Sequence, residues 1–188
     1  MIFSAAAAPM PPSPCTIRPA LASDLATVLQ VETLAFGQEI EANLVKDLLS
    51  DPTAQPSVSL LAWQNNQAVG HILFTAAHLS HTAAAILAPL AVIPTAQRQG
   101  IGTQLVQAGC SHLAQAGVDL VFVLGDPNYY GRFGFTPALP LGLDAPYELP
   151  AAYVNAWMVH DLSDDKTPVI QGKVTCADSL SKPDYWQE

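Results

Sequence analysis

A single apolar run in the middle of the chain constrains the fold more than any other feature. The run "TAAAILAPLAVIP", from Thr82 to Pro94, contains no charged residue. Its apolar part, Ala83 to Ile93, is about half as long as a membrane-spanning helix needs to be. A short run of this kind is typical of a buried strand. Because Pro89 cannot donate a ladder hydrogen bond, we expect a bulge or a splayed position there.

Helical and extended patterns alternate along the rest of the chain. Extended patterns are predicted at residues 15–20, 57–64, 67–80, 118–124 and 152–162, with a weak one at 169–175. Helical patterns are predicted at residues 23–36, 39–50 and 100–116, with a short helix at 128–132. No internal repeat is present. This order predicts an α+β fold with a mixed sheet.

Local signals specify how several of these elements begin and end. Ser23 is expected to cap the first helix, and Asp126 suits the N-cap of the short helix. Asn65–Asn66 favours a hairpin turn, and Gly117 is expected to close the long helix. The first helix should turn one face inward, with Glu32 on that face beside Leu25, Val28, Leu29 and Phe36.

The charge pattern argues against a polyanionic partner. The chain has a formal net charge of -9, with 7 basic residues that are scattered rather than clustered. Nucleic acids and anionic membranes both require clustered Lys or Arg, so neither is expected as a partner. An acidic surface suits a cationic substrate such as an amine.

The cysteines and the chain ends indicate a cytoplasmic protein. Cys15, Cys110 and Cys176 lie far apart and form no zinc-binding pattern, so we expect reduced thiols and no metal. Residues 1–14 resemble a flexible leader rather than a secretory signal, because no positive charge precedes their short apolar run. Residues 15–162 are expected to form one domain, and residues 163–188 an extension packed on it.

The turn after the central strand has the chemistry of an anion-binding loop. A P-loop is excluded because no lysine follows either glycine in "QRQGIGTQLV", and a dinucleotide fingerprint lacks its third glycine. The remaining pattern is Q/R-x-x-G-x-G/A, filled by Gln97, Gly100 and Gly102. In such a turn, backbone N–H groups and a helix N-terminus bind a pyrophosphate. A plain helix start after a strand is the alternative.

The setting of this turn resembles the GNAT superfamily of acyl-CoA-dependent N-acetyltransferases, and most closely the YhbS-type predicted acetyltransferases. "LAPLAVIPTAQRQGIGTQLVQAG" is similar to the family's central strand, pyrophosphate loop and helix. "GDPNYYGRFGF" is similar to its later signature, with Tyr130 four residues before Gly134. An early "ETLAFG" and a later "PYE" extend the resemblance over residues 17–162. It implies a three-layer α+β fold with a mostly antiparallel central sheet, splayed at the central strand and flanked by helices.

The resemblance also implies a set of site residues. Tyr130 would protonate the departing CoA thiolate, and the backbone N–H of Leu90 would hold the oxyanion. Acetyl-CoA is the implied co-substrate. The residues expected to contact it are Leu90, Ala91, Val92, Gln97, Arg98, Gln99, Gly100, Ile101, Gly102, Thr103, Tyr129, Tyr130 and Arg132.

The general base is harder to find, because the central strand contains no acid. Glu32 is a candidate, since a carboxylate on an apolar helix face has a raised pKa. The competing interpretation is a rim glutamate paired with a base such as Arg18. His71, His78 and His81 stay open as well.

Together these features predict an N-acetyltransferase that moves acetyl from acetyl-CoA to a primary amine by direct attack in a ternary complex. A non-catalytic acyl-CoA-binding module of the same fold is the alternative, and a nucleotide-binding oxidoreductase is disfavoured by the missing glycine. The acceptor pocket is expected between residues 36–39 and 136–150. The sequence does not identify the acceptor, and it leaves a homodimer open.

Overall fold

A seven-stranded sheet forms the centre of the molecule. The computed structural model describes residues 14–80, 82–163 and 170–186. The strands lie in the order β1 (Thr16–Pro19), β2 (Val58–Gln64), β3 (Gln67–Leu79), β4 (Thr82–Val92), β5 (Leu120–Leu124), β8 (Trp157–Asp161) and β6 (Thr136–Pro137). Neighbouring strands are antiparallel except for the parallel β4–β5 pair. The mixed, mostly antiparallel sheet is therefore confirmed.

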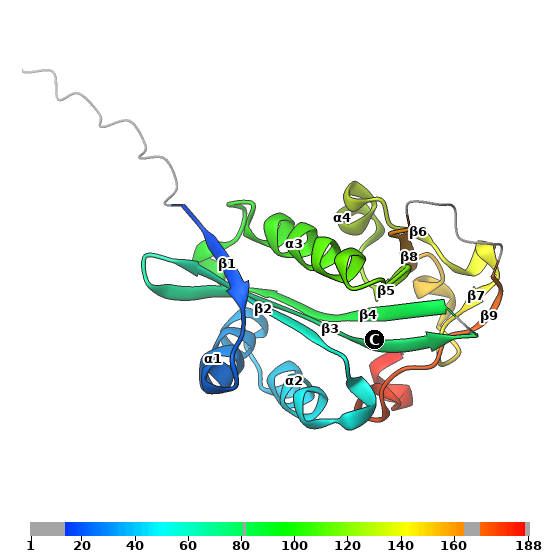
Figure 1. Cartoon of the computed structure of the whole chain (residues 1–188), viewed down its shortest axis with the longest axis horizontal. Coiled ribbons are helices and arrows are strands. Elements are labelled where there is room, and N and C mark those ends of the chain that lie inside the picture. The colour runs from blue at the N-terminus through cyan, green and yellow to red at the C-terminus, as the bar shows by residue number, and fades with distance from the viewer. Residues whose placement is uncertain (1–13, 81, 164–169, 187–188) are drawn as a thin grey trace, which may run out of the picture.

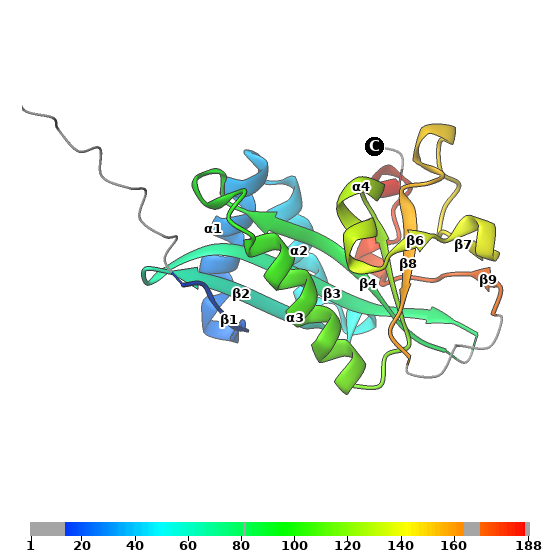
Figure 2. The ribbon, with the colours of Figure 1, turned by 90° about the horizontal axis from the view of Figure 1, so that it is seen from above.

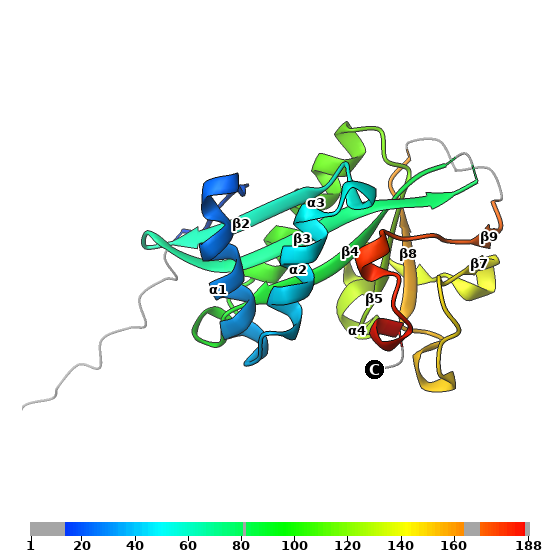
Figure 3. The same ribbon diagram turned by 90° about the horizontal axis from the view of Figure 1, so that it is seen from below.

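Helices cover both faces of this sheet and make the fold three-layered. Helices α1 (Leu25–Phe36) and α2 (Ile40–Ser50) lie together on one face, as Figures 1 and 3 show. Helix α3 (Ile101–Gln115) crosses the opposite face, and the short α4 (Pro127–Tyr130) lies near the end of β5 on that side (Figure 2). No helix in the described part of the chain is long and apolar enough to cross a membrane.

The turns and the irregular strand follow the local signals. Asn65 and Asn66 both have positive φ, at 51° and 61°, as the two-residue turn between β2 and β3 requires. Register between β3 and β4 slips opposite the Ala88–Pro89 peptide, because Ile72 pairs with Leu90 whereas Phe74 pairs with Leu87. The irregularity expected at the proline is therefore present.

The start of the first helix differs from the prediction. Ser23 is not its N-cap, because a 3-10 turn at Ala22–Asp24 precedes the helix. The Asp24 carboxylate instead accepts the Leu21 N–H at 2.8 Å and pairs with Arg18 at 2.7 Å, and these contacts lower the pKa of Asp24 to about 2.

The inward face of α1 also differs. Leu25 and Phe36 are 37% and 41% exposed, whereas Val28, Val31 and Glu32 are buried. The helix starts later than predicted, and the stripe at positions 28, 31 and 32 is the one that packs on the sheet.

The two C-terminal strand predictions are too long. Residues 151–153 form a 3-10 turn, so the strong strand begins only at Trp157. The weak candidate at 169–175 is reduced to β9 (Gly172–Lys173), which pairs with β7 (Leu143–Asp144), and its residue 169 lies outside the described residues.

Close packing between α3 and β3 gives a test of the fold. A Cβ added at Gly109 would lie 2.2 Å from a ring carbon of Phe74, which is fully buried. We expect Gly109→Ala to destabilise the protein by about 1–3 kcal/mol through overpacking, more than the roughly 1 kcal/mol that alanine gains in a helix. Thermal unfolding of this variant measures the effect. Gln107→Ala, at an exposed position of the same helix, is the control and should stay within about 0.5 kcal/mol of the parent. Unchanged stability of Gly109→Ala would contradict the packing.

Candidate functional site

The site begins where β4 loses its parallel neighbour. Pairing between β4 and β5 ends at Leu87–Val123. On the other side of β4, the Ile93 N–H donates to the Val69 carbonyl of β3 at 3.0 Å. Because polar groups of a strand alternate between its two sides, those of Leu90 and Val92 point away from β3, toward the gap. The sheet is therefore splayed beyond Leu87, and β4 presents free backbone groups there.

A cavity of about 500 Å³ lies beside this free edge, between the loop before α3 and helix α4. It is lined by residues from β4, the loop and α4: Leu90, Val92, Ala96, Gln97, Arg98, Gly100, Ile101, Gly102, Thr103, Tyr129 and Arg132. Ten of the thirteen residues predicted to contact the cofactor are among them. Arg98 and Arg132 give this cavity a cationic wall.

The loop holds its shape through backbone conformation and one side-chain contact. Arg98 and Gly100 have positive φ, at 61° and 82°, which turns the chain sharply into α3. The Gln97 amide donates to the Val92 carbonyl at 3.0 Å and ties the loop to the strand. The first N–H groups of α3 lack helical partners and lie at this cavity, so the arrangement suits an anion.

Gly102 lies against the hydroxyl end of Tyr129. A Cβ at this position would lie 2.4 Å from the Tyr129 hydroxyl oxygen. Arg132 stacks on the same ring at 4.6 Å and donates to the Tyr129 carbonyl at 3.2 Å. Tyr129 therefore forms a wall of the cavity, and it can lie there because Gly102 has no side chain.

Three predicted cofactor residues lie elsewhere. Ala91 is buried, and by the alternation along β4 its backbone groups face β3. The Gln99 side chain turns to Gln64 and to the Thr95 carbonyl, at 3.3 and 3.2 Å. Tyr130 lines the neighbouring cavity instead.

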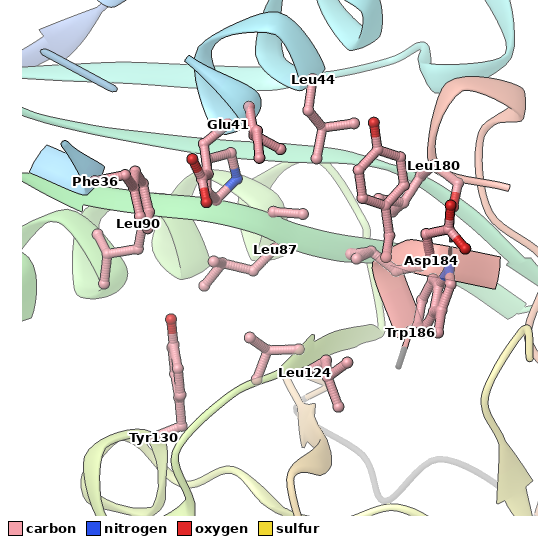
Figure 4. Close-up of a pocket in the computed structure, with 16 residues that line it drawn as sticks. Phe36, Glu41, Leu44, Leu87, Leu90, Leu124, Tyr130, Leu180, Asp184 and Trp186 are labelled. Carbon is pink, nitrogen blue, oxygen red and sulfur yellow. Dashed lines mark hydrogen bonds between the residues drawn. The ribbon is translucent and has the colours of Figure 1, made fainter. Parts of the chain in front are cut away.

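This second cavity, of about 440 Å³, opens on the other side of Leu90. Leu90 lines both cavities, so they meet at the free edge of β4. The walls of the second cavity come from α1, α2, β4, β5, α4 and the C-terminal segment, and include Phe36, Ile40, Leu44, Leu87, Leu124 and Trp186 (Figure 4). Glu41 and Asp184 are its only charged lining residues among those that the structure describes. The cavity is apolar with an acidic edge, which suits a cation.

Tyr130 stands at the floor of the second cavity with its hydroxyl pointing into it (Figure 4). Asp126 caps α4 by accepting the Asn128 N–H at 2.9 Å, and this cap fixes the turn that carries Tyr130. Burial raises the pKa of Tyr130, and the neighbouring Tyr129 raises it further. The hydroxyl therefore stays protonated at neutral pH and is available as a donor.

Glu32 occupies a different place from both of its predicted settings. It is fully buried and hydrogen-bonded to Nδ1 of His71 at 2.5 Å, and it does not line the second cavity. The expected partner Arg18 was wrong, because Arg18 pairs with Asp24. His78 is exposed on β3, and His81 lies outside the described residues.

Sequence reasoning missed Glu41 and the C-terminal wall. Glu41 lies three residues before Leu44 on α2, and both line the cavity, so helical spacing was a usable signal. Leu180, Asp184 and Trp186 gave none, because they reach the site only through tertiary packing. The predicted loop 136–150 does not line the cavity. Its Leu143 carbonyl accepts the Trp157 indole N–H at 3.0 Å, which holds that loop at the far strands.

Hydrogen bonds to Asp51 hold the C-terminal wall in place. One Asp51 oxygen accepts the N–H and hydroxyl of Thr53, and the other accepts the Ser179 N–H at 2.8 Å. The Asp178 N–H donates to the Thr53 hydroxyl at 2.8 Å. These hydrogen bonds, those from Thr53 first, hold the pKa of Asp51 well below its usual range.

Comparisons with known proteins bear on the family and the fold of the chain. The profile of the Acetyltransferase (GNAT) family matches residues 25–135. The uncharacterized N-acetyltransferase YjhQ of Escherichia coli strain K12 is 44% identical over 83% of this chain and 88% of its own length. The crystal structure of Escherichia coli YhbS in complex with CoA superposes with a TM-score of 0.80 at 29% identity, over 89% of this chain and 92% of that one. A GNAT family acetyltransferase from Brucella melitensis in complex with acetyl-CoA gives a TM-score of 0.69 at 27% identity, over 88% and 97%.

The Asp51 contacts predict how the C-terminal wall can be released. Asp51→Ala removes the acceptor for Ser179, so we expect chymotrypsin to cleave after Tyr185 several-fold faster than in the parent. Timed digestion followed by mass spectrometry measures the rate. Asp47→Ala, at an exposed position of α2, is the matched control. Equal cleavage rates in the Asp51 variant and the parent would show that this carboxylate does not hold the segment.

Proposed function

The chain belongs to the GNAT family of acetyltransferases, and from this we propose that it moves acetyl from acetyl-CoA to a primary amine by direct attack in a ternary complex. The observation that carries the proposal is the meeting of the two cavities at Leu90. One is cationic and suits the phosphates of CoA, and the other is acidic and suits an amine. A thioester spanning Leu90 would place its carbonyl between them.

The first cavity holds the cofactor in this proposal. The pyrophosphate lies on the N–H groups of Gly100–Thr103, at the N-terminus of α3. Arg98 and Arg132 face the same cavity and add positive charge. The pantetheine arm pairs with the backbone groups of Leu90 and with the Val92 N–H, which point toward the gap, as an added strand would. The CoA and acetyl-CoA complexes of YhbS and of the Brucella melitensis protein support this assignment.

The reaction then takes place at the end of the arm. The neutral amine attacks the thioester carbonyl, and the Leu90 N–H stabilises the oxyanion that forms. The Tyr130 hydroxyl donates to the departing sulfur. Its raised pKa makes it a weak acid, so it acts on the developing thiolate and regains its proton from the nitrogen as the amide forms.

The cysteines do not support an acetyl-enzyme route. Burial raises the pKa of Cys110 and of Cys176 to about 11, and it raises the pKa of Cys15 as well. A thiol needs a lowered pKa or an adjacent base to act as a nucleophile at neutral pH. None of the three lines either cavity. Direct transfer needs no such residue.

The pyrophosphate assignment predicts a binding defect that can be separated from protein strain. In Gly102→Ala/Tyr129→Phe the nearest protein contact of the new methyl, the Tyr129 hydroxyl, is gone. The methyl still blocks close approach of the phosphates, so we expect the Kd for acetyl-CoA to rise at least about tenfold over that of Tyr129→Phe, or roughly 1.4 kcal/mol. Calorimetry measures both values. Gly131→Ala is the neutral control, since nothing lies within 4 Å of its added Cβ. Equal affinity of the double and single variants would refute the loop assignment.

The role of Tyr130 predicts a defect in turnover rather than in binding. Tyr130→Phe removes only the hydroxyl, so kcat should fall on the order of 10²-fold with little change in the KM for acetyl-CoA. Thiol release measured over a panel of primary amines gives both constants. Tyr153→Phe, whose side chain lines neither cavity, is the control. Unchanged kcat at every pH would mean that another group protonates the sulfur. Tight binding of acetyl-CoA without turnover on any amine would favour the non-catalytic module.

A further inference from the structure

Glu41 is the acid that the second cavity offers to an amine. It lies in the first turn of α2, across the cavity from Tyr130 (Figure 4). Its Oε1 accepts a hydrogen bond from the Gln38 amide at 3.1 Å. Its Oε2 is enclosed and has no hydrogen-bond partner among the described residues. Buried carboxylate oxygens are rarely left unpaired, so this atom is where a donor is missing.

A second unpaired carboxylate oxygen lies on the neighbouring helix α1. Glu32, on α1, is fully buried, and its Oε2 also has no partner among the described residues. Its Oε1 is bound to Nδ1 of His71, which is itself fully buried on β3. Two neighbouring helices therefore each carry a glutamate with one unsatisfied oxygen.

The two carboxylates interact electrostatically. Burial raises the pKa of Glu32, His71 lowers it, and the charge of Glu41 raises it. Helices α1 and α2, which carry the two carboxylates, pack directly on each other.

The hydrogen-bonded chain continues from His71 to the opposite edge of the helical layer. Nε2 of His71 and the hydroxyl of Ser59 are 2.9 Å apart. Ser59 is half-buried and lines a separate cavity of about 240 Å³, beside Leu21, Leu25 and Leu49. An imidazole bonded at both nitrogens can accept a proton on one side and release one on the other.

We propose that Glu41 takes the proton of the acceptor ammonium and that Glu32, His71 and Ser59 carry it away to the cavity on the far side. The proposal rests on the acetyltransferase function proposed above and names its general base. Glu41 contacts the substrate and is a catalytic residue in it, whereas Glu32 and His71 act through Glu41.

The protons balance over one turnover. A primary ammonium carries three protons on nitrogen and the amide product carries one. The first proton leaves to the Glu41 carboxylate before attack and passes to the Glu32–His71 pair, which goes from a net charge of −1 to zero. His71 then releases a proton toward Ser59 and water. The second leaves the nitrogen after the C–N bond forms and replaces the proton that Tyr130 gives to sulfur as the C–S bond breaks.

Among the nearby titratable groups, Glu41 and Glu32 are the carboxylates that take up the proton in this route. The titratable groups around the two carboxylates are His71 behind them and, across the cavity, Tyr130, Asp184 and Tyr185. Asp184 is exposed, so it keeps its own hydration. Burial raises the pKa of Tyr130, so this hydroxyl accepts no proton at neutral pH.

Carboxyl-labelled glutamate tests the coupling without any substrate. The chain has five glutamates, at positions 32, 39, 41, 148 and 188, so ¹³C NMR gives few resonances to assign. In Glu41→Gln the opposing charge is gone, and we expect Glu32 to titrate at lower pH, by about half a unit or more. Glu39→Gln, two residues earlier and exposed, should leave the Glu32 curve in place. A Glu32 curve that is identical in Glu41→Gln and the parent overturns the relay.

Rate against pH tests the direction of the proton. In Glu41→Gln the kcat/KM for the amine should fall on the order of 10²-fold at pH 7 and recover as pH approaches the pKa of the free amine. Glu32→Gln and His71→Asn should show smaller losses with the same recovery. A loss that is equal at every pH, with a lowered unfolding temperature, indicates a structural role and overturns the proposal. Full activity of Glu41→Gln at every pH contradicts only the relay, whereas absence of turnover in the parent contradicts the proposed function.

Discussion

The structure depends on the point where β4 loses β5. Up to Leu87 the strand has a hydrogen-bonded neighbour on both sides, and beyond it one side is open. Backbone N–H and C=O groups that lack partners must find them in water or in a ligand. The loop before α3 and the short α4 keep this edge from being covered by another strand, so the gap persists as two cavities that share Leu90. Both cavities therefore depend on the point at which the hydrogen-bonded ladder between β4 and β5 ends.

Much of the fold could be predicted from the sequence because its signals are local. The β2–β3 turn needs two residues that tolerate positive φ, and Asn65–Asn66 supplies them within the turn itself. The first helix shows where local reasoning fails. Ser23 is a good N-cap residue, yet Asp24 is held by Arg18 and by the Leu21 N–H, so the helix starts later. Arg18, on strand β1, therefore helps to decide where this helix starts.

The sequence predicted one half of the proposed site better than the other, for the same reason. The cofactor side is mostly one continuous stretch of chain, from Leu90 to Thr103, so its spacing could be read directly. The acceptor side is assembled from six segments, and Glu41 and Trp186 meet there only after folding. Glu32 shows the limit most clearly. Its position on an apolar face was visible, but its partner His71 lies 39 residues away on the other side of a hairpin turn.

The two cavities that share Leu90 carry charges of opposite sign. This difference suits the proposed binding of an anionic cofactor by a chain that is acidic as a whole. Two of its seven basic residues, Arg98 and Arg132, face the cavity that we propose for the cofactor, whereas the charges that face the proposed acceptor cavity are the acids Glu41 and Asp184. Each cavity thus attracts the ligand of opposite sign. An acidic wall also stabilises the ammonium form of an amine, which cannot attack a thioester. A site that binds its acceptor as a cation therefore needs a group that removes a proton after binding, and we propose Glu41 as that group.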